Sequence, residues 1–240
     1  MAVFTIGDTH LSFGTDKPMD IFKGWTDYTD RLEKSWRAIV KDEDTVIIPG
    51  DISWALSLEE AESDLKFLDS LPGKKILGKG NHDFWWATMK KHDSFFEKHG
   101  INSISFLFNN AHVAENIIIA GTRGWYQDEG AQNAPSDADF LKLMNRETLR
   151  LKMSLDAAKA ISETDEGYGK ETIAFMHFPP FWNGKESEPI INLLLERGIT
   201  RLYYGHIHGN YTIDPDFEYK GIKMSIISAD YLGFIPKFIE

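Results

Sequence analysis

Residues 75–83 read Lys-Ile-Leu-Gly-Lys-Gly-Asn-His-Asp, a short apolar run that ends in Gly80-Asn81-His82-Asp83. Asparagine, histidine and aspartate are ligand types for borderline or hard divalent metal ions. Four other segments place the same residue types directly after an apolar run. They are Gly7-Asp8-Thr9-His10, Gly50-Asp51, the lone His177 in Met-His-Phe-Pro-Pro, and Gly205-His206-Ile207-His208.

The first half of the chain alternates strand and helix signals. Short β-type runs lie at 3–6, 45–48 and 75–77, and apolar residues recur at helical spacing over 27–41, 57–68 and 86–99. This order is typical of a parallel sheet with buried strands. Ligands of an open α/β sheet bind beyond the carboxyl ends of its strands, so we expect the five segments to converge at one rim.

The second half has a different pattern. Runs at 104–108 and 116–120 flank Asn-Asn-Ala-His, which predicts a hairpin. The other expected elements are a long helix over 137–163 capped by Ser136, strands at 171–176 and 200–204, a helix at 188–197, and antiparallel strands over 210–232 around Asp214-Pro215-Asp216. We predict a single domain over residues 1–240, with a helical insertion at about 135–165 that covers the site.

The ligand types suit the hydrolysis of a phosphoester. Two metal ions roughly 3.5–4 Å apart can clamp the phosphoryl oxygens, generate a hydroxide and stabilise the in-line transition state. A carboxylate is suited to bridging the ions, and neutral histidine and asparagine complete each shell without cancelling the charge. Such a site is locally positive within an acidic protein, which favours an anionic substrate.

The five segments resemble, in order and context, the pattern of the calcineurin-like metallophosphoesterase family: D-x-H, GD, GNH-D/E, a lone His, and GH-x-H. The resemblance extends from Asp8 to His208. It implies the family's α/β fold, a four-layer α/β/β/α sandwich with two mixed β-sheets. The strand signals favour a parallel first half and a more antiparallel second half.

The resemblance also implies a role for each matching residue. Asp8, His10 and His208 would bind a first metal ion, and Asn81, His177 and His206 a second, with Asp51 bridging the two. His82 would contact the phosphate and act as general acid, and Asp83 would orient its ring. The expected cofactors are two divalent metal ions. Manganese or iron is favoured by the resemblance, and zinc is also compatible with nitrogen and oxygen ligands.

Composition narrows the possible partners and location. The 240-residue chain has a formal net charge of −11, which argues against a general nucleic-acid-binding surface. It contains no cysteine, so zinc–thiolate sites and cysteine nucleophiles are excluded.

A ligand at position 8 leaves no room for a signal peptide, and no apolar run is long enough to span a membrane. We expect a cytoplasmic protein that has no membrane partner.

Aromatic residues gather after the ligand segments. Five of the seven tryptophans follow strand-end segments: Trp54, Trp85, Trp86, Trp125 and Trp182. One interpretation is an aromatic pocket, with Trp125 and Trp182 as substrate contacts, and the other is packing of the rim loops. Arg123 is a candidate phosphate contact or a salt-bridge residue. We expect the other histidines (His92, His99 and His112) to be solvated or cap-like, and Arg146, Glu147 and Arg150 to form a surface pattern.

The sequence therefore predicts a metal-dependent phosphoesterase. The favoured substrate is a small-molecule phosphodiester or nucleotide, with a phosphomonoester as the alternative. Three other classes compete: a non-catalytic scaffold of the same fold, a metal-binding or sensor protein, and a di-metal oxidoreductase. The complete ligand set argues against the first, His82 and Asp83 against the second, and the absence of Glu-x-x-His helix pairs against the third. Oligomeric state and pathway are open at this stage.

Overall fold

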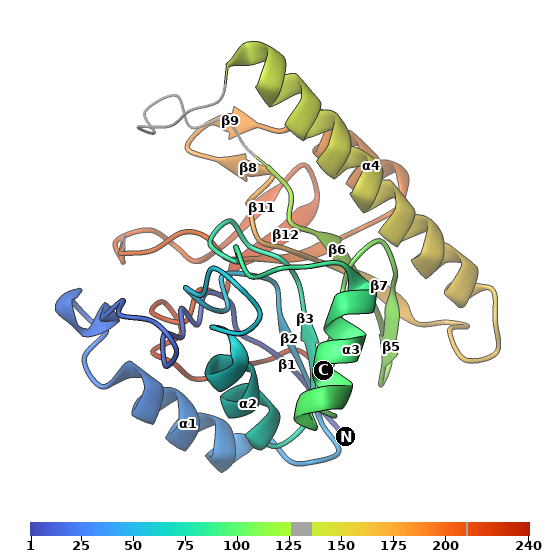
Figure 1. The fold of residues 1–240 in the computed structure, drawn as a ribbon. Helices are drawn as coiled ribbons and strands as arrows, with labels where there is room; N and C mark the ends of the chain where they lie inside the picture. Colours follow the sequence, from blue (N-terminus) through green and yellow to red (C-terminus); the bar gives the residue numbers. More distant parts are fainter. Residues whose placement is uncertain (126–135, 210) are drawn as a thin grey trace.

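The computed structural model describes residues 1–125, 136–209 and 211–240. Five strands form a first sheet in the order β13-β1-β2-β3-β4. Its central strands β1, β2 and β3 lie side by side in Figure 1. Their bounds are β1 Val3–Thr5, β2 Thr45–Ile48, β3 Lys74–Leu77, β4 Ile104–Phe106 and β13 Lys237–Phe238. The strands β1 to β4 are parallel, and only β13 runs antiparallel at the edge. This sheet matches the βαβαβα order that the sequence predicts.

Six strands form a second sheet in the order β11-β12-β10-β7-β6-β5. Their bounds are β5 His112–Ala114, β6 Ile117–Thr122, β7 Glu171–Met176, β10 Arg201–Tyr204, β11 Asp216–Tyr219 and β12 Ile222–Ile226. The four central strands are parallel, and β5 and β11 are antiparallel edges. A small hairpin joins β8 Phe181–Trp182 to β9 Lys185–Glu186.

Helices cover the sheets on their outer sides (Figure 1). The first sheet carries α1 Tyr28–Ile39, α2 Glu62–Ser70 and α3 Met89–His99, and a short 3-10 helix at Met19–Ile21 precedes α1. The second sheet carries α4 Asp137–Ser162 and α5 Glu188–Glu196. Ser136 caps α4 as predicted, since its Oγ accepts a hydrogen bond from Asp139 N at 3.3 Å.

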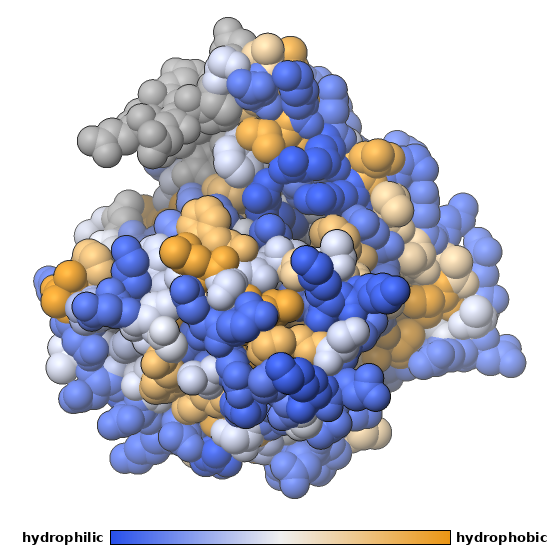
Figure 2. All heavy atoms as spheres, viewed as in Figure 1, coloured by the Kyte–Doolittle hydropathy of each residue, from blue (hydrophilic) through white to orange (hydrophobic). Residues whose placement is uncertain are grey.

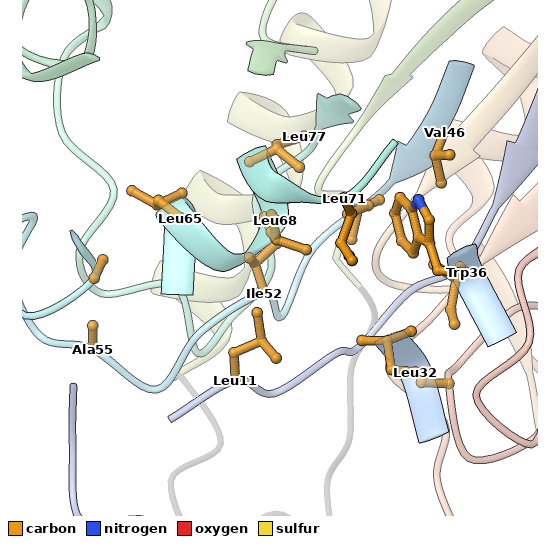
Figure 3. Packing of buried hydrophobic residues seen from close by; sticks show 14 of the residues in the cluster. Leu11, Leu32, Trp36, Val46, Ile52, Ala55, Leu65, Leu68, Leu71 and Leu77 are labelled. Atoms are coloured by element: carbon orange, nitrogen blue, oxygen red, sulfur yellow. The ribbon is translucent and has the colours of Figure 1, made fainter. Parts of the chain in front are cut away.

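Successive side chains of each strand point to opposite faces of its sheet, and this alternation creates the layers. In β2, Val46 and Ile48 pack beneath the helices of the first sheet, whereas Ile47 faces the second sheet. In β6, Ile118 and Ala120 join the apolar cluster of α4 and α5, whereas Ile117 and Ile119 meet Ile47 between the sheets. Figure 3 shows the apolar cluster between the first sheet and its helices, where Trp36 of α1 and Leu68 of α2 pack over the sheet. The predicted four-layer α/β/β/α class is thereby confirmed.

Two predictions about strand pairing are wrong. Residues 104–106 do not form a hairpin with 116–120, because they follow α3 and extend the first sheet in parallel. The partner of β6 is instead His112–Ala114. The antiparallel turn after β10 lies at Lys220-Gly221, both with positive φ, and not at Asp214–Asp216. The second half is more antiparallel than the first, as predicted, but its four central strands are parallel, because α4 and α5 act as crossover helices between neighbouring strands.

Candidate metal centre and adjoining pocket

The seven predicted ligands lie directly beyond the carboxyl ends of five strands. The first sheet contributes Asp8 and His10 after β1, Asp51 after β2 and Asn81 after β3. The second sheet contributes His177 after β7, and His206 and His208 after β10. The structure thus brings residues from both sheets to one rim.

The first ligand group consists of Asp8, His10 and His208. One ligand atom of each lies within 4.8 Å of the others. His10 Nε2 and His208 Nε2 are 3.2 Å apart, and His208 Nε2 is 3.4 Å from Asp8 Oδ1. Asp8 and His10 are buried, so this group is closed to solvent except near His208.

The second group consists of Asp51, His177 and His206, whose ligand atoms meet the same 4.8 Å limit. Asn81 adjoins it, with Oδ1 2.7 Å from His177 Nε2 and 2.9 Å from His206 Nδ1. Asp51 Oδ2 lies 3.5 Å from His177 Nε2 and 3.7 Å from His10 Nε2. Asp51 is therefore placed between the two groups, where one carboxylate can serve both.

The electrostatics of the cluster suit cations. Burial, followed by the neighbouring Asp8 and Asp83, raises the pKa of Asp51 well above its ordinary value. Burial and the surrounding imidazoles lower the pKa of His10 and His177. Neighbouring carboxylates thus repel one another, and the imidazoles of His10 and His177 are held neutral with lone pairs free to bind a cation. Divalent ions would offset this repulsion, and a nitrogen and oxygen donor set without sulfur fits them.

Two motif positions are glycine because a carboxylate of the site lies too close to their backbone for any side chain. A Cβ at Gly80 would overlap the Asp51 carboxylate, and a Cβ at Gly205 would overlap the Asp8 carboxylate. The ligands also adopt unusual backbone, since φ is 54° at Asp8, 43° at His10, 50° at Asp51 and 69° at His206. Non-glycine residues rarely occupy this left-handed region, so strain is concentrated at the ligands.

Asp230 is a site residue that the sequence reasoning missed. Its Oδ1 lies 2.9 Å from His208 Nδ1, and its Oδ2 accepts hydrogen bonds from Gly209 N and Tyr211 Oη. Although burial opposes it, Asp8 and Asp230 raise the pKa of His208 to about 10. Such a carboxylate fixes the orientation of a ligating imidazole. The signal was available, because Asp230 also follows an apolar strand run, β12.

His82 lies at the border of the two groups. Its side chain is 35% exposed, and its Nε2 is 4.0 Å from Asp51 Oδ2. Its backbone N donates to Asp51 Oδ1 at 2.8 Å, and its ring lies 4.2 Å from that of Trp54. Burial lowers its pKa. His82 is thus the accessible imidazole beside Asp51.

The expected contact of Asp83 with the His82 ring is wrong. No hydrogen bond joins these two side chains within the described part of the chain, and Asp83 is fully buried. Its Oδ1 accepts from the backbone N of Ile52 and Ser53 and from Trp85 Nε1, and its Oδ2 accepts from Gly80 N. Asp83 therefore holds together the loops after β2 and β3, which carry Asp51 and Asn81.

Arg123 forms an ion pair with Glu147, with Nη2 3.3 Å from Oε1. Glu147 is completely buried and also pairs with Arg146 and Arg150, so the predicted surface pattern on α4 is wrong. The Arg123 carbonyl accepts from Phe178 N, which places this network beside His177. Arg123 remains a candidate phosphate contact, although its observed partner is a carboxylate.

A cavity of about 420 Å³ opens beside His10, His82 and His208. Its aromatic lining comes from Phe22, Trp25, Trp54 and Tyr211. Of these, only Trp54 belongs to the predicted aromatic group.

The other predicted tryptophans are not part of this lining. Trp85 is buried, and Trp86 packs against the core of the first sheet. Trp125 contacts Phe178 at 4.9 Å, and Trp182 lies in β8 against the cluster of the second sheet. Trp125 is one ring removed from the metal ligands, because Phe178 contacts both His177 and His206. Its role as a substrate contact stays a prediction.

His92, expected to be solvated, is fully buried among Trp85, Trp86 and Phe106, and its Nε2 accepts from Ala87 N at 3.1 Å. Within residues 1–125, 136–209 and 211–240, no helix combines the length and the apolarity needed to cross a membrane.

Comparison with known proteins places this architecture among solved folds. The protein TT1561 of Thermus thermophilus is 11% identical, with a TM-score of 0.56 over 95% of this chain and 89% of that one. The phosphopantetheinyl hydrolase of Mycobacterium tuberculosis is 13% identical, with a TM-score of 0.54 over 99% of this chain and 95% of that one. At such identities the likeness shows the fold alone.

No curated protein matches this sequence significantly. The family model of the calcineurin-like phosphoesterases matches residues 1–210, a range that contains all seven predicted ligands. The two mixed sheets agree with the fold of that family, and residues of the motifs form two groups that could hold metal ions. The chain therefore belongs to the calcineurin-like phosphoesterase family.

Proposed function

We propose that this protein hydrolyses a small-molecule phosphodiester or nucleotide at a centre of two divalent metal ions. The observation that carries the proposal is the joining of two ligand groups by one buried carboxylate, with an accessible histidine at their border. Asp51 lies between the groups and His82 adjoins it. A storage or sensor site would not need that histidine.

The ligand roles follow from the grouping. Asp8, His10 and His208 would hold one ion, and His177, His206 and Asn81 the other, with Asp51 shared. When bound, the ions would polarise the phosphoryl oxygens and lower the pKa of a water molecule. We propose that both ions are manganese or iron, with zinc as the alternative.

The protein's own residues would do the rest. Asp51 accepts a hydrogen bond from His82 N, so the shared ligand also fixes the backbone of the general acid. The His82 ring packs against Trp54, which limits its rotation. From that position it would deliver a proton to the departing alkoxide. Asp83 holds the supporting loops and touches neither reacting atoms nor the His82 ring.

The test compares a bis(p-nitrophenyl) phosphodiester with p-nitrophenyl phosphate. The protein would be stripped with chelator and reloaded with manganese, alongside Asp51→Asn and His82→Ala. His99→Ala is the control histidine, because its Nδ1 pairs with Glu62 on the helical side of the first sheet. We expect metal-dependent turnover that Asp51→Asn abolishes, that His82→Ala lowers through the lost phosphate contact, and that His99→Ala leaves unchanged.

The outcomes separate the alternatives. Faster turnover of the diester supports the favoured substrate class, and faster turnover of the monoester supports a phosphomonoesterase. If stoichiometric metal binding is measured without turnover of either ester, the hydrolase proposal for small esters fails. A non-catalytic scaffold of the same fold is then the better explanation.

A further inference from the structure

The cavity beside His82 has a composition that the metal site does not require. Its floor is formed by His10, His82 and His208, and its walls include Met19, Phe22, Trp25, Trp54 and Tyr211. Apart from the site histidines, the only charged side chain among the described lining residues is Lys23. An anionic phosphoryl group would be held by the metal ions, so the walls are free to bind a different part of the substrate.

The walls are anchored to the ligands. Trp25 is 3% exposed and contacts the His208 ring at 5.7 Å, and Trp54 stacks on His10 at 4.9 Å. Tyr211 Oη donates to Asp230, the carboxylate that contacts His208. The Tyr211 hydroxyl also adjoins the backbone of Gly24, next to Trp25, because a Cβ at Gly24 would lie 3.3 Å from Tyr211 Oη. The pocket is thus largely formed before a substrate binds.

Phe22 differs from these anchored rings. Its side chain is 53% exposed, and within the described residues it has no aromatic partner. Figure 2 shows an apolar group at its left edge, over the segment that leads into α1, where Ile21 and Phe22 are both exposed. An exposed phenylalanine beside a cavity offers a ring face to a ligand at little cost in fold stability.

The position of His82 identifies which part of the substrate enters. His82 forms part of the floor and would protonate the oxygen that leaves phosphorus. In the reaction, the bond from phosphorus to that oxygen breaks and a bond from phosphorus to a water oxygen forms. One proton of the water ends on the released alcohol and the other oxygen substituent stays on phosphorus, so the products are the alcohol and a phosphate monoester. The alcohol therefore departs on the side of the pocket.

We propose that the leaving alcohol of the substrate carries a flat aromatic group that binds between Phe22, Trp54 and Tyr211. This inference rests on the proposed hydrolase function and names its substrate class. A cavity of about 420 Å³ is far larger than a methyl or ethyl group needs. Aromatic rings pair edge to face or offset-stacked, which favours a flat ring over an alkyl chain.

The experiment measures kcat/KM for two ethyl phosphodiesters that differ in leaving group, 1-naphthyl and trifluoroethyl, with manganese-loaded protein. Phe22→Ala is the test variant. Phe13→Ala is the matched control, because Phe13 is 50% exposed but contacts Phe67 and lines no part of this cavity. We expect Phe22→Ala to lower kcat/KM for the naphthyl ester by about tenfold and to change the trifluoroethyl ester less than about twofold. Phe13→Ala should leave both unchanged.

Binding of the product 1-naphthol, measured by calorimetry, gives a readout that needs no turnover. It should weaken in Phe22→Ala and not in Phe13→Ala. The pocket assignment would be overturned if Phe22→Ala affected both esters equally, or if it left the dissociation constant of 1-naphthol unchanged. Preference for an octyl over the naphthyl ester would overturn the aromatic assignment. Failure of the wild-type protein to cleave any ester, with intact naphthol binding, would instead refute the hydrolase function.

Discussion

At the scale of single residues, His92 shows how burial changes a side chain's chemistry. Desolvation by burial lowers its pKa to about 4, although the negative charge of the neighbouring Asp93 acts to raise the pKa. Its Nε2 must stay unprotonated to accept from Ala87 N. Below its folded pKa the ring would carry a charge inside an aromatic cluster and lose that hydrogen bond.

The sign of the pH effect follows from this lowered pKa. The neutral ring is favoured in the fold, so its contribution is complete above the ordinary histidine pKa of about 6.5. That contribution is lost as pH falls from there towards 4. We expect the difference in unfolding free energy between wild type and His92→Gln, measured by urea titration at several pH values, to shrink over this window. A difference that is constant from pH 7.5 to pH 4 would contradict the assignment.

The sequence predicted single residues well where a motif specified their type and position. Six of the seven proposed ligands form two groups that could hold a metal ion, and Asn81 adjoins the second group, because each follows a strand end. It failed for His92, Glu147 and Asp83, whose burial and partners depend on distant parts of the chain. Residue type alone cannot distinguish a buried histidine or glutamate from a solvated one.

At the scale of elements, α4 is fixed by one buried carboxylate. Glu147 accepts from Thr122 Oγ1, which belongs to β6, and pairs with Arg123, Arg146 and Arg150. Three guanidinium groups thus depend on one oxygen, Oε1. In the same helix, Ser154 Oγ donates to Asn110 O and accepts from Gly121 N, so α4 contacts both β6 and the loop before β5.

Removing this carboxylate should destabilise the second sheet. Glu147→Ala leaves guanidinium groups, including the mostly buried Arg123, without their partner, and such losses cost about 3–5 kcal/mol. Glu147→Gln, which keeps the shape, should lose less. The control is Glu163→Gln, at the exposed C-terminal end of α4. Urea unfolding would measure the effect, and a loss below about 1 kcal/mol for Glu147→Ala would show that the network is not stabilising.

Element boundaries were more predictable than element pairing. The helices at 28–39, 137–162 and 188–196 lie within a few residues of their predicted limits, because helical periodicity is local. Strand pairing is not local. The chain crosses from the first sheet to the second between β4 and β5, and no turn residue in Phe108-Asn109-Asn110 distinguishes that crossing from a hairpin.

At the scale of the whole molecule, the site joins the two sheets. Ligands after β1, β2 and β3 meet ligands after β7 and β10, and a β-bridge between Gly7 and Ser228 connects the segments that follow β1 and β12. Metal ions bound there would therefore link both halves of the sandwich. Ions that bind only the folded state stabilise it by mass action.

We expect thermal unfolding to depend on metal. Manganese at 100 times its dissociation constant should add about 2.7 kcal/mol of stability, and chelator should remove it. Asp51→Asn should reduce the gain strongly, since Asp51 lies between the two ligand groups. Differential scanning calorimetry with and without chelator would measure this. An unfolding temperature that ignores manganese would contradict the proposed centre.

The left-handed backbone conformation at Asp8, His10, Asp51 and His206 has a consequence for how related proteins can evolve. Each such residue stores strain of roughly 1 kcal/mol or more, which selection for the proposed metal centre would maintain. In a lineage no longer selected for the proposed metal centre, glycine or asparagine at these positions would relieve that strain. Neutral drift should therefore erase the ligands before it erases the sheets, and the inactive descendants would keep the same fold.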